Sequence, residues 1–139
     1  MTIKEIESQI IEEFEVFTDW LDKYEYLIEL GKSLTVIKES NKLDANLIKG
    51  CQSKVWLAAD YSDGKIYFTA DSDAIITKGI ISLLIRVFSG RTPAEIIEAD
   101  LDFINKIGLQ DNLSPTRANG LLSMIKQIKF YALAFSANN

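Results

Sequence analysis

The sequence predicts an α+β domain of two layers, in which a three-stranded antiparallel sheet is packed by helices. Towards both ends, apolar residues recur at intervals of three and four, as in amphipathic helices. In the middle, short segments rich in β-forming residues follow one another and are separated by tight-turn signals. Consecutive strands joined in this way should pair as an antiparallel meander.

Size and composition place the chain among single globular domains. It has 139 residues, of which 47% are hydrophobic and 25% charged, and we assign residues 1–139 to one domain. The longest uncharged apolar run, residues 79–85, is too short to cross a bilayer. The first residues, with Lys4 and Glu5, do not resemble a signal peptide. We therefore expect a cytoplasmic protein that is not in a membrane.

Two helices are predicted before the sheet. The first covers residues 3–17, where isoleucines and phenylalanines alternate with glutamates at helical spacing. The second starts at Asp19, a plausible N-cap, and Gly31 is the expected stop. The two should form a helical hairpin or a bent helix, and the polar residues 38–46 that follow should form a loop.

Three strands are predicted in the centre of the chain. The first is the short segment Leu47-Ile48, and the second covers residues 55–59, where side chains alternate. Ser62-Asp63-Gly64 is a hairpin signal, and the third strand covers residues 66–70. Gly50 and Cys51 stand at a turn between the first two strands.

The second half of the chain is predicted to be helical. An apolar helix from residue 74 to 88 should be capped by Ser72 or Asp73, and Gly79 within it indicates a close approach, by the sheet or by the cysteine loop. A capping box at residues 92–95 starts a short helix, and a broken helical region continues to residue 108. Ser114-Pro115 opens the last helix.

The distribution of charge argues against nucleic-acid binding. The net charge is −5, and the acidic excess lies in the first half of the chain. No basic stripe is present that could neutralise phosphates. The acidic helical surface is either solvated or complementary to a basic patch on another protein.

Cys51 is the only cysteine, and the chain has no histidine. This chain alone can therefore hold neither an ordinary zinc site nor a cysteine-ligated cluster. The pair Asp71 and Asp73 lacks the other ligands of a calcium loop. We expect neither a metal nor a cofactor. Protease-type catalysis needs a histidine, and dithiol cycling needs a second cysteine. Two interpretations remain: Cys51 is a small buried hydrophobe, or its thiolate attacks sulfur on another molecule.

Arg117 is the candidate electropositive neighbour of Cys51. It lies in the first turn of the last helix, where an arginine opposes the helix dipole, so its position needs another reason. Pairing with an anion is one reason, and an ordinary surface pair with a carboxylate such as Asp111 is the alternative.

Several motifs occur together in a characteristic order. They are YEYLIELG at residues 24–31, GCQSKVW at 50–56, DSDA at 71–74 with KG at 78–79, and LSPTRANGL at 113–121. In these motifs, and over nearly its whole length, the chain resembles SufE, the sulfur-acceptor family of iron–sulfur cluster assembly. The resemblance implies the fold of SufE and NifU-like proteins.

The resemblance also implies a reaction and its partners. A pyridoxal-phosphate cysteine desulfurase, of the SufS or CsdA type, forms a persulfide, and Cys51 accepts its outer sulfur and passes it to an iron–sulfur scaffold of the SufBCD type. Supporting roles would fall to the remaining site residues, which are Gly50, Gln52, Ser53, Trp56, Asp73 and Arg117.

For these residues the resemblance implies particular tasks. Gly50 would give the loop freedom to extend, and Arg117 would stabilise anionic sulfur or hold the loop at rest. Asp73 would be a helix cap that also positions the loop. At rest, Cys51 would lie in a mostly apolar cavity, with Trp56 and residues 74–88 as candidate walls.

Two alternative functions stay open. The protein could activate a desulfurase by binding alone, without carrying sulfur, or it could be an iron–sulfur scaffold like IscU, which would need several metal ligands. We expect a monomer or a weak homodimer that acts with a desulfurase and is not a stand-alone enzyme.

Overall fold

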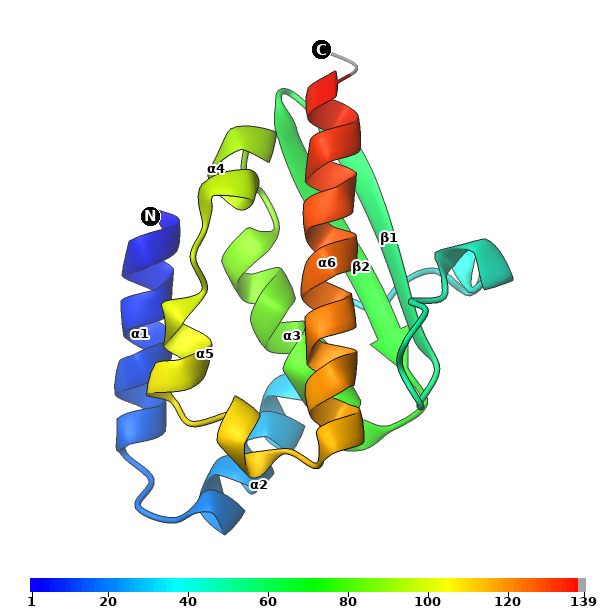
Figure 1. Ribbon diagram of the computed structural model, residues 1–139. Coiled ribbons are helices and arrows are strands. Elements are labelled where there is room, and N and C mark those ends of the chain that lie inside the picture. Colours follow the sequence, from blue (N-terminus) through cyan, green and yellow to red (C-terminus); the bar gives the residue numbers. More distant parts are fainter. Residues whose placement is uncertain (138–139) are drawn as a thin grey trace.

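A long antiparallel hairpin with two helices across one face forms the centre of the molecule in the computed structural model, which describes residues 1–137 (Figure 1). Strand β1 (Val55–Ser62) pairs with β2 (Lys65–Ser72) in the register Ser62 to Lys65. The turn residues Asp63 and Gly64 have positive φ angles of 52° and 78°, which suit a tight hairpin turn. The predicted hairpin is therefore confirmed.

The two faces of the hairpin have different environments. Val55 and Leu57 on β1, and Ile66, Phe68 and Ala70 on β2, are buried on the inner face. Helices α3 (Ile75–Phe88) and α6 (Pro115–Ala137) cover this face (Figure 1). Because side chains alternate along a strand, the residues between them point to the outer face. The structure is thus α+β with helices packed on a sheet, as predicted.

The sheet has two strands, so the prediction of three was wrong. Leu47 forms only an isolated antiparallel bridge with Trp56, in which the Ile48 N–H donates to the Val55 carbonyl at 2.8 Å. The chain cannot extend this pairing, because the residues before Leu47 form a 3₁₀ turn and the chain turns away at Gly50. At the opposite edge, Val36 makes a single parallel bridge to Ala70, which the sequence did not reveal.

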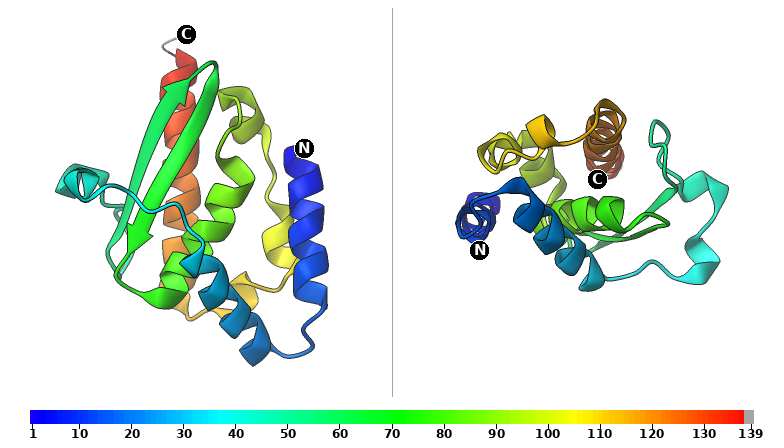
Figure 2. Two further views of the ribbon diagram at one scale, coloured as in Figure 1. Left: turned by 180° about the vertical axis from the view of Figure 1, so that it is seen from behind. Right: turned by 90° about the horizontal axis from the view of Figure 1, so that it is seen from below.

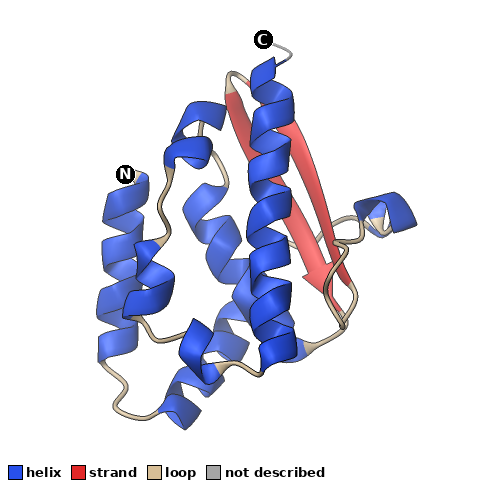
Figure 3. Ribbon diagram, viewed as in Figure 1, coloured by secondary structure: helices blue, strands red, loops and turns tan. Residues whose placement is uncertain are grey.

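Helices α1 (Ile3–Glu15) and α2 (Trp20–Lys32) pack against α3, α4 (Pro93–Glu98) packs against α6, and α5 (Asp102–Lys106) packs against α1. The two views in Figure 2 place α1 and α2 beside α3, and Figure 3 separates the helical part from the hairpin. Buried side chains from these helices and the hairpin form one cluster. No helix within residues 1–137 is long and apolar enough to cross a membrane. Three short 3₁₀ turns lie within the described residues, and they are η1 (Glu39–Asn41), η2 (Asp44–Asn46) and η3 (Gln110–Asn112).

Two glycines allow α2 and α3 to touch through their backbones. A Cβ atom on Gly79 would lie 2.2 Å from the Leu27 carbonyl oxygen, and one on Gly31 would lie 2.9 Å from the Gly79 nitrogen. The close approach expected at Gly79 is real, but α2 makes it, not the sheet or the cysteine loop. Helix α2 ends at Lys32, one residue after Gly31, so the predicted end of the helix is confirmed to within one residue; Gly31 itself is still helical and is buried at this contact.

Local signals located most helix starts. Asp19 caps α2 by accepting the Asp22 N–H at 2.9 Å, and Thr92 forms the predicted capping box with Glu95. The cap of α3 was predicted wrongly. Ala74 occupies the N-cap position without a side-chain hydrogen bond, and the nearby polar side chains hold the Cys51 loop instead.

Candidate functional site

The Cys51 loop, defined here as residues 49–53, is fixed at both ends by the hairpin. On one side, the Ile48 N–H donates to Val55. On the other, the Lys54 N–H donates to Asp73 Oδ1 at 3.0 Å, and the Ser72 hydroxyl donates to the Lys54 carbonyl at 2.8 Å. The end of β2 therefore clamps the base of the loop while residues 49–53 lie beyond the ladder.

Gly50 is required where the loop meets α6. Its φ is +92°, a region that favours glycine. A Cβ atom at this position would also lie 2.4 Å from Ser123 Oγ on α6. Any other residue would strain the backbone, and the Ser123 hydroxyl would have to rotate away from it.

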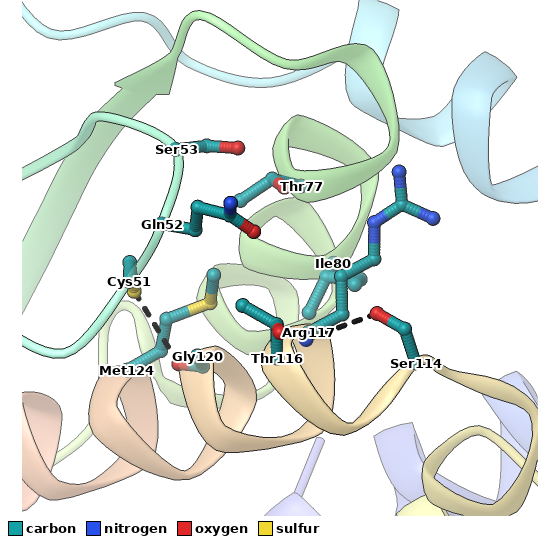
Figure 4. A pocket seen from close by; sticks show the side chains of 10 residues that line it. All are labelled: Cys51, Gln52, Ser53, Thr77, Ile80, Ser114, Thr116, Arg117, Gly120 and Met124. Atoms are coloured by element: carbon teal, nitrogen blue, oxygen red, sulfur yellow. Dashed lines mark hydrogen bonds between the residues drawn. The ribbon is translucent and has the colours of Figure 1, made fainter.

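The Cys51 thiol is turned toward α6. Its Sγ donates to the Gly120 carbonyl oxygen at 3.5 Å, and the side chain is half-buried (Figure 4). Burial raises the pKa of the thiol above its ordinary value, because the thiolate loses solvation there. In this position Cys51 is predominantly a neutral thiol.

A hollow of about 370 Å³ opens beside the thiol. The Cys51 loop forms one wall with Gln52 and Ser53, and α3 contributes Thr77 and Ile80 (Figure 4). This α3 wall was expected. The polar character of the lining was not, because the resemblance implied a mostly apolar cavity.

Helix α6 forms the third wall, with Gly120 and Met124 next to Cys51 and with Ser114, Thr116 and Arg117 at its N-terminal end. The chain is helical from Pro115 onward, and Ser114 Oγ accepts the Arg117 N–H at 3.3 Å.

Arg117 lines the hollow, but its side chain points away from Cys51 (Figure 4). Its Nη1 donates to the Tyr24 hydroxyl on α2 at 3.2 Å. Within the described residues no carboxylate lies at ion-pair distance from the guanidinium, so the alternative pair with Asp111 is absent. The hollow therefore has a cation at its rim that is not neutralised by a carboxylate.

Trp56 does not line the hollow. Alternation along β1 places it on the outer face of the hairpin, where Lys42 Nζ lies 5.3 Å from the centre of its ring. There Lys42 also pairs with Asp71 at 2.8 Å, and Lys78 approaches the same carboxylate at 3.3 Å. Burial alone would raise the pKa of Asp71, but hydrogen bonds from Lys42, the Ser72 N–H and Lys78 lower it. Trp56 thus belongs to an ion-pair cluster that flanks the loop from outside.

Among residues 1–137 no group of three or more potential ligand side chains is placed to hold a metal ion. A family model described as the Fe-S metabolism associated domain, SufE, matches residues 8–132. The chain belongs to the SufE family.

Two relatives that are named SufE-like proteins match this chain over most of its length. An uncharacterized SufE-like protein of Synechocystis sp. is 43% identical over 128 residues, which are 92% of this chain and 80% of that one. An uncharacterized SufE-like protein of Rhizobium meliloti is 43% identical over 127 residues, 88% of this chain and 91% of that one. Membership of the SufE family associates the chain with iron–sulfur metabolism.

A solved structure has the same fold. The solution structure of a hypothetical protein from Thermus thermophilus superimposes with a TM-score of 0.76 at 21% identity, and the match covers 93% of this chain and 94% of that one. At this identity the likeness concerns the fold alone.

Several SufE site neighbours were missed by sequence reasoning. Thr77 and Met124 carry no pattern that separates them from ordinary helix residues. Gly120 did carry a signal, because a glycine inside a helix costs about 1 kcal/mol relative to alanine and often has a packing reason. Tyr24, the partner of Arg117, lies 93 residues away in the chain, so only the folded structure brings the two together.

Proposed function

We propose that the protein is a sulfur carrier whose Cys51 accepts the outer sulfur of a cysteine desulfurase persulfide. The donor is a desulfurase of the SufS or CsdA type, and the sulfur passes on to an iron–sulfur scaffold of the SufBCD type. One observation carries the proposal: the only thiol of a SufE-family chain lies on a loop outside the ladder, beside a hollow with an arginine at its rim.

The transfer is a thiol–persulfide exchange. The Cys51 thiolate attacks the outer sulfur of the desulfurase persulfide, a new S–S bond forms, and the S–S bond inside the donor persulfide breaks. The desulfurase cysteine leaves as a thiolate with the electron pair of that bond. The proton of Cys51 passes to solvent before attack, so the step needs neither an oxidant nor an acid–base residue of this chain.

The loop has to leave its resting position before the reaction. Cys51 Sγ faces the Gly120 carbonyl, so an in-line approach by the sulfur of a second protein is blocked from that side. Release into a partner removes the burial that raises the thiol pKa, and the thiolate then becomes more accessible. The resting position keeps the thiol, and later the persulfide, away from the thiols of other proteins, because one side of the sulfur is covered by α6.

The neighbours of Cys51 have distinct roles in this proposal. Gly50 permits the backbone conformation of the loop, and Asp73 holds its base through the Lys54 N–H. Gln52 and Ser53 line the hollow, and Arg117 at its rim stabilises anionic sulfur once its side chain turns from Tyr24 toward Cys51.

Mass spectrometry tests the carrier function directly. After anaerobic incubation with a desulfurase and cysteine, the Cys51 peptide should gain about 32 Da, which is one sulfur atom. Absence of this adduct while the desulfurase is active would contradict sulfur carriage.

A variant separates the carrier from a binding activator. Cys51→Ala should abolish the acceleration of alanine and sulfide production if sulfur passes through Cys51. If the variant accelerates the desulfurase as well as the parent protein does, binding alone explains the activity. A stable cluster formed on the protein during anaerobic reconstitution would instead indicate a scaffold.

A further inference from the structure

Thr77 is a buried hydroxyl residue that faces the hollow beside Cys51. It is 6% exposed, and its side chain forms no hydrogen bond with any described residue. The residue is buried as a whole, but its hydroxyl oxygen is not enclosed by protein atoms, so it is open to the hollow. Its position on the wall of the hollow points to a partner inside the hollow.

Other polar groups around the hollow are also unused. The side chains of Gln52, Ser53 and Thr116 form no hydrogen bond within residues 1–137. They come from the Cys51 loop and from α6, whereas Thr77 comes from α3, so the groups converge from three parts of the chain (Figure 4). Convergent donors from separate elements are the features of a small-ligand site.

The electrostatic character of the hollow favours an anion. Thr77 lies in the first turn of α3, and Thr116 and Arg117 lie in the first turn of α6, so the positive ends of two helix dipoles meet there. Arg117 adds a full positive charge at the rim, and no acidic side chain is among the described residues that line the hollow. Cys51 lines the same hollow, so a bound anion lies within reach of a nucleophilic sulfur.

We propose that this hollow binds the anionic group of a small compound that carries transferable sulfur, so that Cys51 can be loaded without a desulfurase. Thiosulfate is the simplest such compound, and a persulfide of cysteine, which carries a carboxylate, has the same chemistry. This inference rests on the proposed function, because it uses the same thiol as acceptor. The volume of about 370 Å³ is at the small end of ligand pockets, which suits a compound of this size.

The reaction with thiosulfate balances without another reactant. Cys51 first loses its proton to solvent, which reaches it through the hollow; the thiolate then attacks the outer sulfur of thiosulfate and forms an S–S bond, and the bond between the two thiosulfate sulfurs breaks. Sulfite leaves with the electron pair of that bond, and Cys51 is left as a persulfide. The groups that hold the anion, Thr77 and Arg117, then hold the departing sulfite, and they stabilise the charge that it acquires. With cysteine persulfide, the leaving group is the cysteine thiolate.

Anaerobic loading followed by mass spectrometry tests the inference. The parent protein is incubated in separate arms with thiosulfate, with cysteine persulfide, and with a desulfurase plus cysteine. We expect a gain of about 32 Da on the Cys51 peptide in at least one of the first two arms, with sulfite released in the thiosulfate arm. Loading by only one of the two compounds supports the inference and identifies the donor.

Variants test whether the hollow is the binding site. Thr77→Val and Arg117→Gln should each slow small-molecule loading by about tenfold or more, the loss expected for one hydrogen bond to a charged group. The matched controls are Thr69→Val, on the outer face of the hairpin, and Lys126→Gln, an exposed cation of α6 outside the hollow, and both should load as the parent does. Calorimetry on Cys51→Ser should detect thiosulfate binding that Thr77→Val weakens.

The outcomes distinguish this inference from the proposed function. Loading by the desulfurase but by neither small compound overturns the inference and leaves the proposed function intact. Loading that proceeds equally in Thr77→Val, Arg117→Gln and the controls also overturns it, because the reaction would then not use the hollow. Loading in none of the three arms contradicts both.

Discussion

Cys51 Sγ lies 3.5 Å from the Gly120 carbonyl oxygen, and a Cβ atom on Gly120 would also lie 3.5 Å from the sulfur. The thiol therefore rests at a point of α6 where a residue no larger than alanine fits. Thiol and helix are in contact, so the position of Cys51 depends on the size of residue 120. This relationship can be tested separately from sulfur transfer.

Gly120→Val should release the Cys51 loop from α6. The branched side chain would occupy the space of Sγ, and the loop would have to open to relieve the overlap. We expect alkylation of Cys51 by iodoacetamide to become about tenfold faster, which corresponds to about 1.4 kcal/mol of lost docking.

Gly120→Ala is the matched control. Its Cβ atom would make an ordinary van der Waals contact with Sγ, so the loop should stay docked. The helix should gain up to about 1 kcal/mol of stability by urea unfolding. Equal alkylation rates in the valine and alanine variants would contradict a steric role for position 120.

Asp73→Ala should loosen the base of the loop. It removes the carboxylate that accepts the Lys54 N–H at 3.0 Å, and we expect a loss of about 1 kcal/mol in the free energy of unfolding. Hydrogen exchange at the Lys54 amide should become faster. Asp73→Asn keeps an acceptor oxygen and should retain most of the protection; if both variants exchange alike, the charge and not the hydrogen bond would be decisive.

The rate of Cys51 alkylation should rise with pH, and the midpoint of this rise should lie above the pKa of an ordinary thiol, which is about 8.5. Burial raises the pKa of Cys51 in the folded protein, so the thiolate fraction at neutral pH is lower than in the unfolded chain. In urea the midpoint should return to the ordinary value. A lower midpoint in the folded protein than in urea would show that the thiol is activated at rest.

The raised pKa of Cys51 also makes the free energy of unfolding depend on pH. The folded state holds the thiol proton more tightly, so the contribution is fully present below the unfolded pKa and is lost as the pH rises through the folded pKa. Relative to Cys51→Ala, the parent protein should therefore lose stability only at alkaline pH, measured by urea unfolding at several pH values.

Gly79→Ala should destabilise the whole fold. The new Cβ atom would lie 2.2 Å from the Leu27 carbonyl oxygen, and backbone on both sides must move apart. We expect a loss of about 3 kcal/mol in the free energy of unfolding. Gly64→Asn is the control, because that turn has open space around it and asparagine tolerates its φ angle, so its loss should stay below about 1 kcal/mol.

The helices were predictable because their signals are local. Capping residues such as Asp19 and Thr92 act on backbone groups within three residues, so a short window contains the cause and the effect. The wrong predictions depended on distant partners. Leu47-Ile48 looks like a strand until the turn at Gly50 limits the pairing to one bridge. Gly31 lies near the end of α2 as predicted, but its contact with Gly79 could not be read from the sequence around it.

The features of the candidate site also fall into those that local sequence predicts and those that depend on distant partners. The sequence singled out Cys51, Gly50 and Arg117 as candidates and gave Asp73 a role in positioning the loop, but it placed Trp56 in the wall of the cavity and also made Asp73 a cap of α3. Strand alternation turns Trp56 to the outer face, and Asp73 accepts the Lys54 N–H across the clamp at the base of the loop. These contacts depend on strand register, which tertiary packing sets.

By itself, the sequence determined that one thiol is available, that no histidine or second cysteine can assist it, and that the family motifs surround it. These are properties of composition and order, which folding does not change. Only the tertiary structure decided that the thiol rests on Gly120, that Arg117 reaches Tyr24, and that Thr77 faces a polar hollow. The reason is that burial and hydrogen bonding depend on which distant segments pack together, and no local pattern in the chain specifies that.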